Sequence, residues 1–114
     1  MKSKKEQRNE YKLMKFRKGL FQIINLKNKK VYLQKSEDLD KAFNSDLFKL
    51  KAGMHANKDM QTDWNELGSD FFEFEILDEL NFNDSATPYQ IEKEIQELLE
   101  LHKTNIKLNG KTLY

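Results

Sequence analysis

Positive charge is concentrated near the start of this chain of 114 residues, and it is the feature of the sequence with the clearest chemical use. Residues 1–35 contain twelve Lys or Arg and two Glu, whereas residues 36–114 contain eight Lys or Arg and seventeen Asp or Glu. Cationic side chains that contact phosphates release condensed counterions, so this asymmetry predicts a basic face for a polyanion such as DNA. The alternative is that these cations only solvate the surface and that the two halves of the chain neutralise each other in the fold.

Several common kinds of site leave no signature in the sequence. The chain has no cysteine, which excludes disulfides and thiolate zinc sites. Its two histidines, His55 and His102, lack the paired spacing of zinc ligands. There is no glycine-rich phosphate loop, and no serine stands in a recognisable relation to a histidine and an acid. Zinc, P-loop and serine-hydrolase chemistry are therefore not predicted.

The composition is that of one globular domain. Hydrophobic residues make up 38% of the chain and charged residues 34%, and there is a single proline. No apolar run approaches 18 residues, and no hydrophobic stretch follows the basic N-terminus, so neither a membrane span nor a signal peptide is predicted. We expect a cytoplasmic protein without a membrane partner.

The elements that must position any site alternate between the two secondary-structure types. Apolar residues at helical spacing predict helices that end at Gly53 and Gly68, the first capped by Ser36 or Asp38, and a last helix that begins near Thr87. Alternating apolar residues and turn signals predict strands. The expected elements are a helix over 6–16 that Gly19 ends, strands over 20–26, 30–35 and 72–77, helices over 38–52, 58–67 and 88–102, and a loop or short closing segment from 103 onward. This order, α-β-β-α-α-β-α, predicts an α+β layer domain with three strands and helices over them.

Two short motifs lie in the first expected hairpin, Gly19-Leu20-Phe21 and Tyr32-Leu33-Gln34, with Phe21 and Tyr32 eleven residues apart. Later segments, 53–57 and 72–79, continue the same pattern in the same order. Together these pieces resemble the GIY-YIG nuclease superfamily, in particular its phage homing-endonuclease subgroup, over about residues 18–105. The resemblance implies a GIY-YIG-like domain over 18–114, a small three-stranded antiparallel sheet flanked by helices, that follows a basic helix-like segment over 1–17.

The resemblance also implies a site for hydrolysis of a DNA phosphodiester. In the family a tyrosine is thought to take the proton of the attacking water, an arginine stabilises the developing charge, and a glutamate holds a divalent ion. The first motif tyrosine falls on Phe21, which lacks the hydroxyl, and the second falls on Tyr32. The arginine falls on Ala42, and a histidine four residues later falls on Asp46. The closing glycine of the second motif falls on Gln34.

The metal glutamate falls near Leu99, so that Glu100 or Glu97 would have to supply the ligand. We expect no cofactor, with Mg²⁺ or Mn²⁺ needed only for residual activity. His55 matches a histidine of the homing subgroup. The alternative is that His55 has only a structural role, as a turn or cap residue. The residues expected to contact nucleic acid are Lys15, Arg17, Lys18, Lys29, Lys30, His55 and Asn57.

These observations favour a nuclease-like domain with impaired catalysis that acts as a nucleic-acid-binding or accessory module. Two alternatives remain at this stage. One is residual metal-dependent nicking of DNA, and the other is a protein-interaction domain that binds partner proteins and no nucleic acid. Whether the chain is an enzyme stays open.

Overall fold

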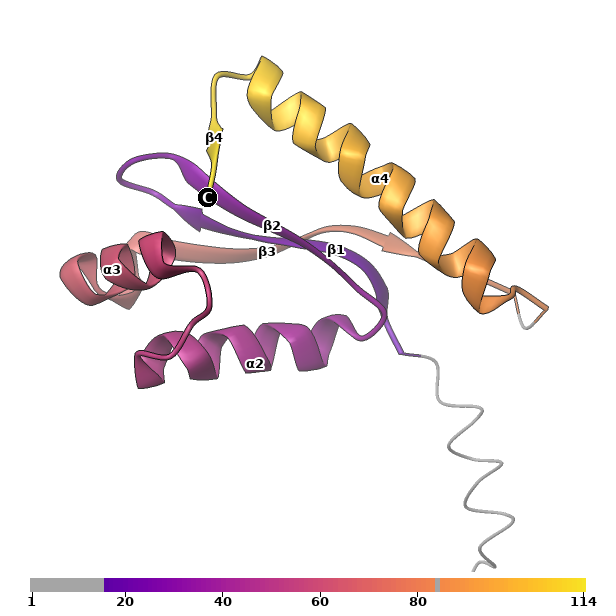
Figure 1. Cartoon of the computed structure of the whole chain (residues 1–114), viewed down its shortest axis with the longest axis horizontal. Helices are drawn as coiled ribbons and strands as arrows, with labels where there is room; N and C mark the ends of the chain where they lie inside the picture. The colour runs from indigo at the N-terminus through magenta and orange to yellow at the C-terminus, as the bar shows by residue number, and fades with distance from the viewer. Residues whose placement is uncertain (1–15, 84) are drawn as a thin grey trace, which may run out of the picture.

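The computed structural model describes residues 16–83 and 85–114 (Figure 1). Its elements are β1 (Lys18–Asn25), β2 (Lys30–Ser36), α2 (Leu39–Ala52), α3 (Lys58–Leu67), the 3₁₀ turn η1 (Ser69–Phe71), β3 (Phe72–Leu80), α4 (Pro88–Leu108) and β4 (Thr112–Leu113). The helix expected over 6–16 and the candidate contact Lys15 lie outside the described residues.

The sheet has the strand order β3-β1-β2-β4. β1 and β2 form the expected antiparallel hairpin, in which Ile23 pairs with Tyr32 and Phe21 with Gln34. β3 runs antiparallel along the other edge of β1. The α+β fold expected from the sequence is confirmed, and its three expected strands are antiparallel. A fourth strand of two residues, β4, pairs parallel to the start of β2 and widens the sheet.

Gly19 lies inside β1, so the expectation that it ends a preceding helix is wrong. Its φ is +153°, and a Cβ added there would lie 2.0 Å from the carbonyl oxygen of Asp78 on β3. The register between the two strands shifts between Leu20 and Phe21, immediately after this close approach. Glycine is therefore needed because the backbones of β1 and β3 meet where a side chain would stand.

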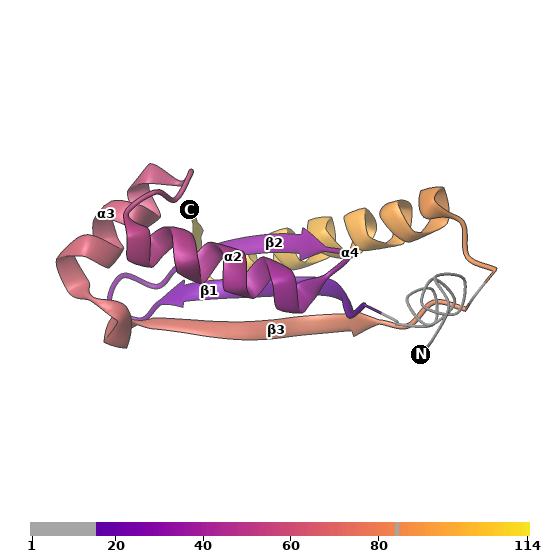
Figure 2. The same ribbon diagram turned by 90° about the horizontal axis from the view of Figure 1, so that it is seen from below.

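Helices α2 and α3 cover one face of the sheet, and α4 covers the other (Figures 1 and 2). Strand alternation sorts the apolar side chains between them. Phe21 and Ile23 pack toward α2 and α3, whereas Leu20, Val31 and Leu33 pack toward α4. The sheet thus separates two hydrophobic clusters, and a side chain on β1 or β2 reaches one helical layer or the other according to its parity.

The helix ends follow the expected capping signals. The Asp38 side chain accepts the Lys41 N–H at the start of α2, and Gly53 ends that helix in the left-handed conformation. Asn57 caps α3 and Gly68 ends it. At the start of α4, Thr87 and Gln90 form a reciprocal capping box.

α4 continues to Leu108, so the expected loop from residue 103 onward is wrong for its first six positions. Ile106 is buried in the same cluster as Ile95 and Leu99, and this burial extends the helix beyond His102. The chain then turns at Gly110 into β4, which is the short closing segment. Among the residues that the structure describes, no helix is long and apolar enough to span a membrane.

Candidate functional site

The positions that carry the nuclease resemblance converge on one small cavity between the hairpin and α2. β1 contributes Phe21, β2 contributes Tyr32 and Gln34, and α2 contributes Ala42 and Asp46. Lys35 and Ser45 complete the lining, and the cavity volume is about 190 Å³. Residues 25 positions apart in the sequence are thus neighbours, because Phe21, Tyr32 and Gln34 all point from the sheet toward α2.

Asp46 forms a hydrogen-bonded pair with His55, whose side chain is 2% exposed. The backbone N–H of Asn57 donates to His55 Nδ1 at 3.0 Å, so this nitrogen carries no proton in the neutral ring. The proton is then on Nε2, which donates to Asp46 Oδ1 at 3.0 Å. The His55 backbone N–H in turn donates to the Gln61 side chain at 2.9 Å. Both ring nitrogens of His55 are therefore engaged within the protein.

Tyr32 is half-buried beside this pair, and its ring meets the His55 ring edge-on with the centroids 5.1 Å apart. Burial, with a further contribution from the negative charge of Asp46, raises the pKa of Tyr32 to about 12. The phenol consequently stays protonated at neutral pH. In this state it can donate a hydrogen bond, but it is a weak base for taking a proton from water.

Lys35 lines the cavity, yet its charge lies on the other side of the sheet. Its Nζ forms an ion pair with Glu92 and donates to the Gln96 Oε1 at 2.8 Å, and both partners belong to α4. Phe21 and Ala42 carry no polar group, and Gln34 and Ser45 are neutral. Within residues 16–83 and 85–114, Asp46 is the one charged group directed into this cavity, and it is negative.

The two glutamates expected to hold a divalent ion lie away from this cavity. Glu97 and Glu100 occupy exposed positions on α4, across the sheet from the cavity. Glu100 accepts the Gln96 side-chain N–H at 2.9 Å and pairs with Lys103. In the part of the chain that the structure describes, no three His, Cys, Asp or Glu side chains are grouped to hold a metal ion.

The residues expected to contact nucleic acid are distributed over the molecule. Arg17 donates two hydrogen bonds to Glu79 and one to Asp40, and these carboxylates raise its pKa further. Lys18 donates to the Phe16 carbonyl. Lys29 and Lys30 lie at the β1–β2 turn, far along the sheet from Arg17. His55 belongs to the buried pair with Asp46, and Asn57 caps the start of α3.

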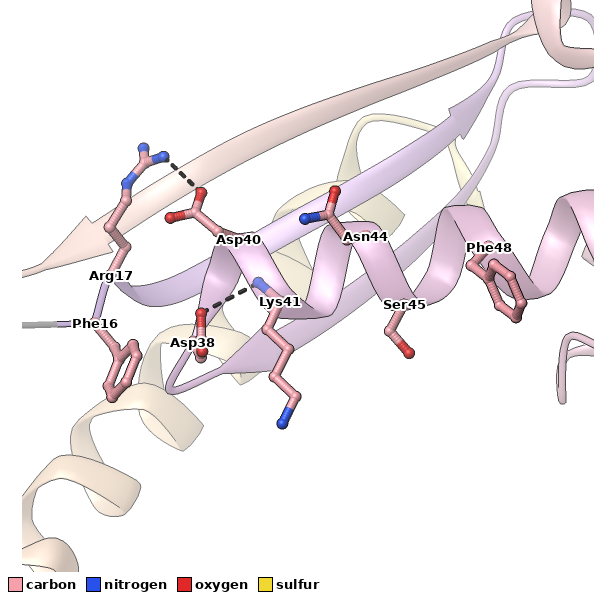
Figure 3. Close-up of a pocket in the computed structure, with 8 residues that line it drawn as sticks. All are labelled: Phe16, Arg17, Asp38, Asp40, Lys41, Asn44, Ser45 and Phe48. Atoms are coloured by element: carbon pink, nitrogen blue, oxygen red, sulfur yellow. Dashed lines mark hydrogen bonds and ion pairs between the residues drawn. The ribbon is translucent and has the colours of Figure 1, made fainter.

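A larger, open pocket of about 700 Å³ lies on the outer side of α2, near the start of β1 (Figure 3). Its lining consists of Phe16, Arg17, Asp38, Asp40, Lys41, Asn44, Ser45 and Phe48. In Figure 3, Arg17 bonds to Asp40, and Asp38 accepts the backbone N–H of Lys41. The positions expected to be catalytic, Phe21, Tyr32, Ala42 and Asp46, do not line this pocket.

Replacing Asp46 tests the buried pair. Asp46→Ala would leave the His55 Nε2–H without its acceptor in a buried position, so we expect a loss of about 1–3 kcal/mol in the free energy of unfolding. Asp46→Asn keeps an acceptor oxygen and should cost clearly less. Urea unfolding followed by circular dichroism measures both. Equal losses in the two variants would contradict a hydrogen bond to His55.

The sequence predicted most of the residues that line the cavity, but not the hydrogen bonds that they form. Ser45 was not predicted, because a lone serine in a helix carries no distinctive signal, and Gln61 was predicted only as part of the segment that resembles the homing subgroup. The Gln61 Nε2 donates to the Leu50 carbonyl at 3.0 Å and to Asn65 at 3.0 Å, so this residue ties the end of α2 to α3. The signal for a structural role of Gln61 is its polar side chain at a buried position of the helix, next to Met60.

Known proteins resemble this chain in sequence and in structure. No protein-family model matches the chain. Intron-associated endonuclease 1 of Enterobacteria phage T4 is 33% identical over 92 residues, which are 81% of this chain, and the match spans 35% of that relative's length. The solved catalytic domain of the homing endonuclease I-TevI has a TM-score of 0.53 and 30% identity, covering 83% of this chain and 96% of that one. A single-residue variant of the same catalytic domain gives a TM-score of 0.53 and 29% identity over 85% of this chain and 93% of that one.

The likeness in sequence and the likeness in structure agree, and the structural match covers nearly the whole catalytic domain of the solved relative. The resemblance seen in the hairpin motifs is confirmed. The chain belongs to the GIY-YIG nuclease superfamily.

Proposed function

We propose that this nuclease-like domain binds DNA and has lost most of its ability to cleave it. The observation that carries the proposal is the charge of the cavity, where Asp46 is the sole charged side chain that the described residues direct inward. A phosphodiester anion in that position would meet a negative charge and no compensating cation. Electrostatic stabilisation of the developing charge is usually the largest single contribution to such catalysis.

The proton-transfer side of the reaction is weakened in the same cavity. Phe21 offers no hydroxyl, and the pKa of Tyr32 is raised to about 12 by burial and by Asp46. A tyrosine with this pKa holds its proton at neutral pH, so an attacking water would have no effective base there. His55 does not replace it, because its Nδ1 accepts from Asn57 and its Nε2 donates to Asp46.

DNA as the partner is supported by the relatives and by the charge of the chain. The similar proteins are an intron-associated endonuclease and a homing endonuclease. This chain spans about a third of the length of the curated relative, so the activity of a longer protein is not transferred with the domain. The cations in residues 1–35 would then serve contact with the phosphate backbone rather than cleavage.

The test is binding of a fluorescein-labelled duplex, followed by anisotropy over a series of NaCl concentrations in EDTA. We expect affinity without a divalent ion, with log K falling linearly against log salt at a slope of about −2 or steeper, because each phosphate contact contributes about −0.9. An uncharged peptide nucleic acid duplex of the same sequence is the control and should not bind. Absence of salt-dependent binding would reject DNA as the partner and favour the protein-interaction alternative.

A further inference from the structure

The turn between β1 and β2 presents a group of lysines at one end of the sheet. Lys27 and Lys29 are exposed, and Lys30 is half-buried at the start of β2. Lys111, just before β4, joins them because its neighbour Thr112 pairs with Lys30. Among the described residues, none of these four forms an ion pair with a carboxylate. We call this group the turn-lysine surface.

The backbone under these lysines is held in one conformation by Asn25, which is fully buried. Its Oδ1 accepts the Lys27 backbone N–H at 2.9 Å, and its carbonyl accepts the Lys29 N–H at 2.8 Å. Asn28 continues the pattern, since its Oδ1 accepts the Lys30 N–H at 2.9 Å. Lys29 itself has a φ of +65°, a conformation that the turn imposes. The side chains therefore project from a preorganised backbone.

The C-terminal residue locks the turn to the rest of the domain. The Tyr114 hydroxyl donates to Asp63 Oδ2 of α3 at 2.6 Å and accepts from Asn25 Nδ2 at 3.0 Å. Asn28 Nδ2 donates to the same Asp63 oxygen at 3.1 Å. In both views the turn, α3 and the C-terminus lie at the same end of the molecule (Figures 1 and 2). Lys30 lies over the Tyr114 ring, with its Nζ 5.5 Å from the ring centroid.

These bonds also engage a carboxylate that lies close to the turn. Asp63 accepts from Tyr114 and Asn28, so its carboxylate is directed inward to the lock rather than outward to the lysines. Arg17, near the start of β1, is by contrast paired with Glu79 and Asp40. Among the described residues, the turn thus gathers four lysines without a carboxylate partner on one preorganised element.

We propose that the turn-lysine surface is where this domain contacts the phosphate backbone of a nucleic acid, at a site separate from the family cavity. This inference rests on the proposed function and adds the surface that performs it. The contact is independent of base sequence, because ammonium groups on a rigid turn match phosphate charge and carry no pattern of donors and acceptors for base edges. Duplex DNA carries one charge per ~1.7 Å of its axis, so several phosphates are within reach of one such end.

The experiment compares two variants with the same change in charge. Lys27→Gln/Lys29→Gln/Lys111→Gln removes three charges from the surface and keeps Lys30, which packs on Tyr114. The control, Lys41→Gln/Lys49→Gln/Lys93→Gln, removes three charges from exposed positions on α2 and α4, outside the turn. Each full-length protein is titrated with two fluorescein-labelled 20-base-pair duplexes of unrelated sequence, over a series of NaCl concentrations. Circular dichroism melting verifies that both variants fold.

We expect the turn variant to lose at least tenfold in affinity for both duplexes at about 0.1 M salt, and the salt slope to become shallower by about 1 for each lysine that contacts a phosphate. The control variant should stay within about threefold of the unmodified protein. Equal losses in the two variants would overturn the assignment of the surface while leaving DNA binding intact. Failure of the unmodified protein to bind either duplex would overturn both this inference and the proposed function.

Discussion

Purified protein is expected to leave supercoiled plasmid DNA uncut in Mg²⁺ or Mn²⁺, at protein concentrations at which it binds the same DNA. The cavity is lined by Ala42 and Asp46, at positions where the resemblance implies an arginine and a histidine. Removing one group that stabilises developing charge typically costs ~10²–10³ in rate. Two such losses multiply to roughly 10⁴–10⁶, which takes cleavage below detection in an ordinary nicking assay.

Variants of the same cavity give this measurement its controls. Ala42→Arg places a guanidinium next to Asp46, so nicking that becomes measurable only in this variant would locate a phosphate in the cavity. Ala42→Arg/Asp46→His restores both missing groups, although it also removes the acceptor of the His55 Nε2–H and its fold must be verified. Nicking by the unmodified protein that Tyr32→Phe abolishes would contradict the prediction and make the chain an active enzyme with an altered set of catalytic groups.

Gly19→Ala is expected to destabilise the protein by about 3–5 kcal/mol, a large part of the stability of a domain of this size. The added methyl would lie 2.0 Å from the Asp78 oxygen and 2.9 Å from its carbonyl carbon, so the β1 and β3 backbones must separate. The φ of +153° adds strain for any residue with a Cβ. Guanidinium unfolding, monitored by circular dichroism, measures the difference.

Gly110→Ala is the matched control for this change. Gly110 also has a positive φ, +76°, but an added Cβ would have no atom within 4 Å. Its cost should therefore be that of left-handed backbone strain alone, about 1 kcal/mol. Similar small losses for the two alanine variants would show that β1 and β3 do not approach as closely as the structure has them.

The two proposals assign DNA binding and DNA cleavage to different places on this domain. Cleavage needs a cavity that stabilises negative charge, whereas attachment to DNA needs only exposed cations with counterions to release. In this chain the cavity is lined by Asp46, which pairs with the buried His55, whereas the turn-lysine surface lies at the β1–β2 turn. Loss of the first property leaves the second unaffected, which is why nicking and binding are expected to give opposite results.

Local patterns in the sequence were sufficient for most element boundaries, and the family resemblance supplied most members of the cavity. The caps at Asp38 and Thr87 and the stop signals at Gly53 and Gly68 depend on backbone groups within one helical turn, so they can be read without knowledge of the fold. The alternation of Phe72, Phe74 and Ile76 likewise predicted a strand with one buried face. The family resemblance that the two hairpin motifs carry predicted that Phe21 and Tyr32 would lie in one site.

Contacts between elements decided the remainder. The role of Gly19 depends on a strand 59 positions later, the helical residues 103–108 depend on the burial of Ile106, and the lock at Tyr114 depends on Asp63 of α3. The Asp46–His55 hydrogen bond joins residues whose separation of nine positions carries no local preference. This hydrogen bond forms because Gln61 and Asn57 bond to His55 and hold the loop after α2 in place. Contacts between elements therefore build an aspartate–histidine pair at the position where the resemblance implies a histidine alone.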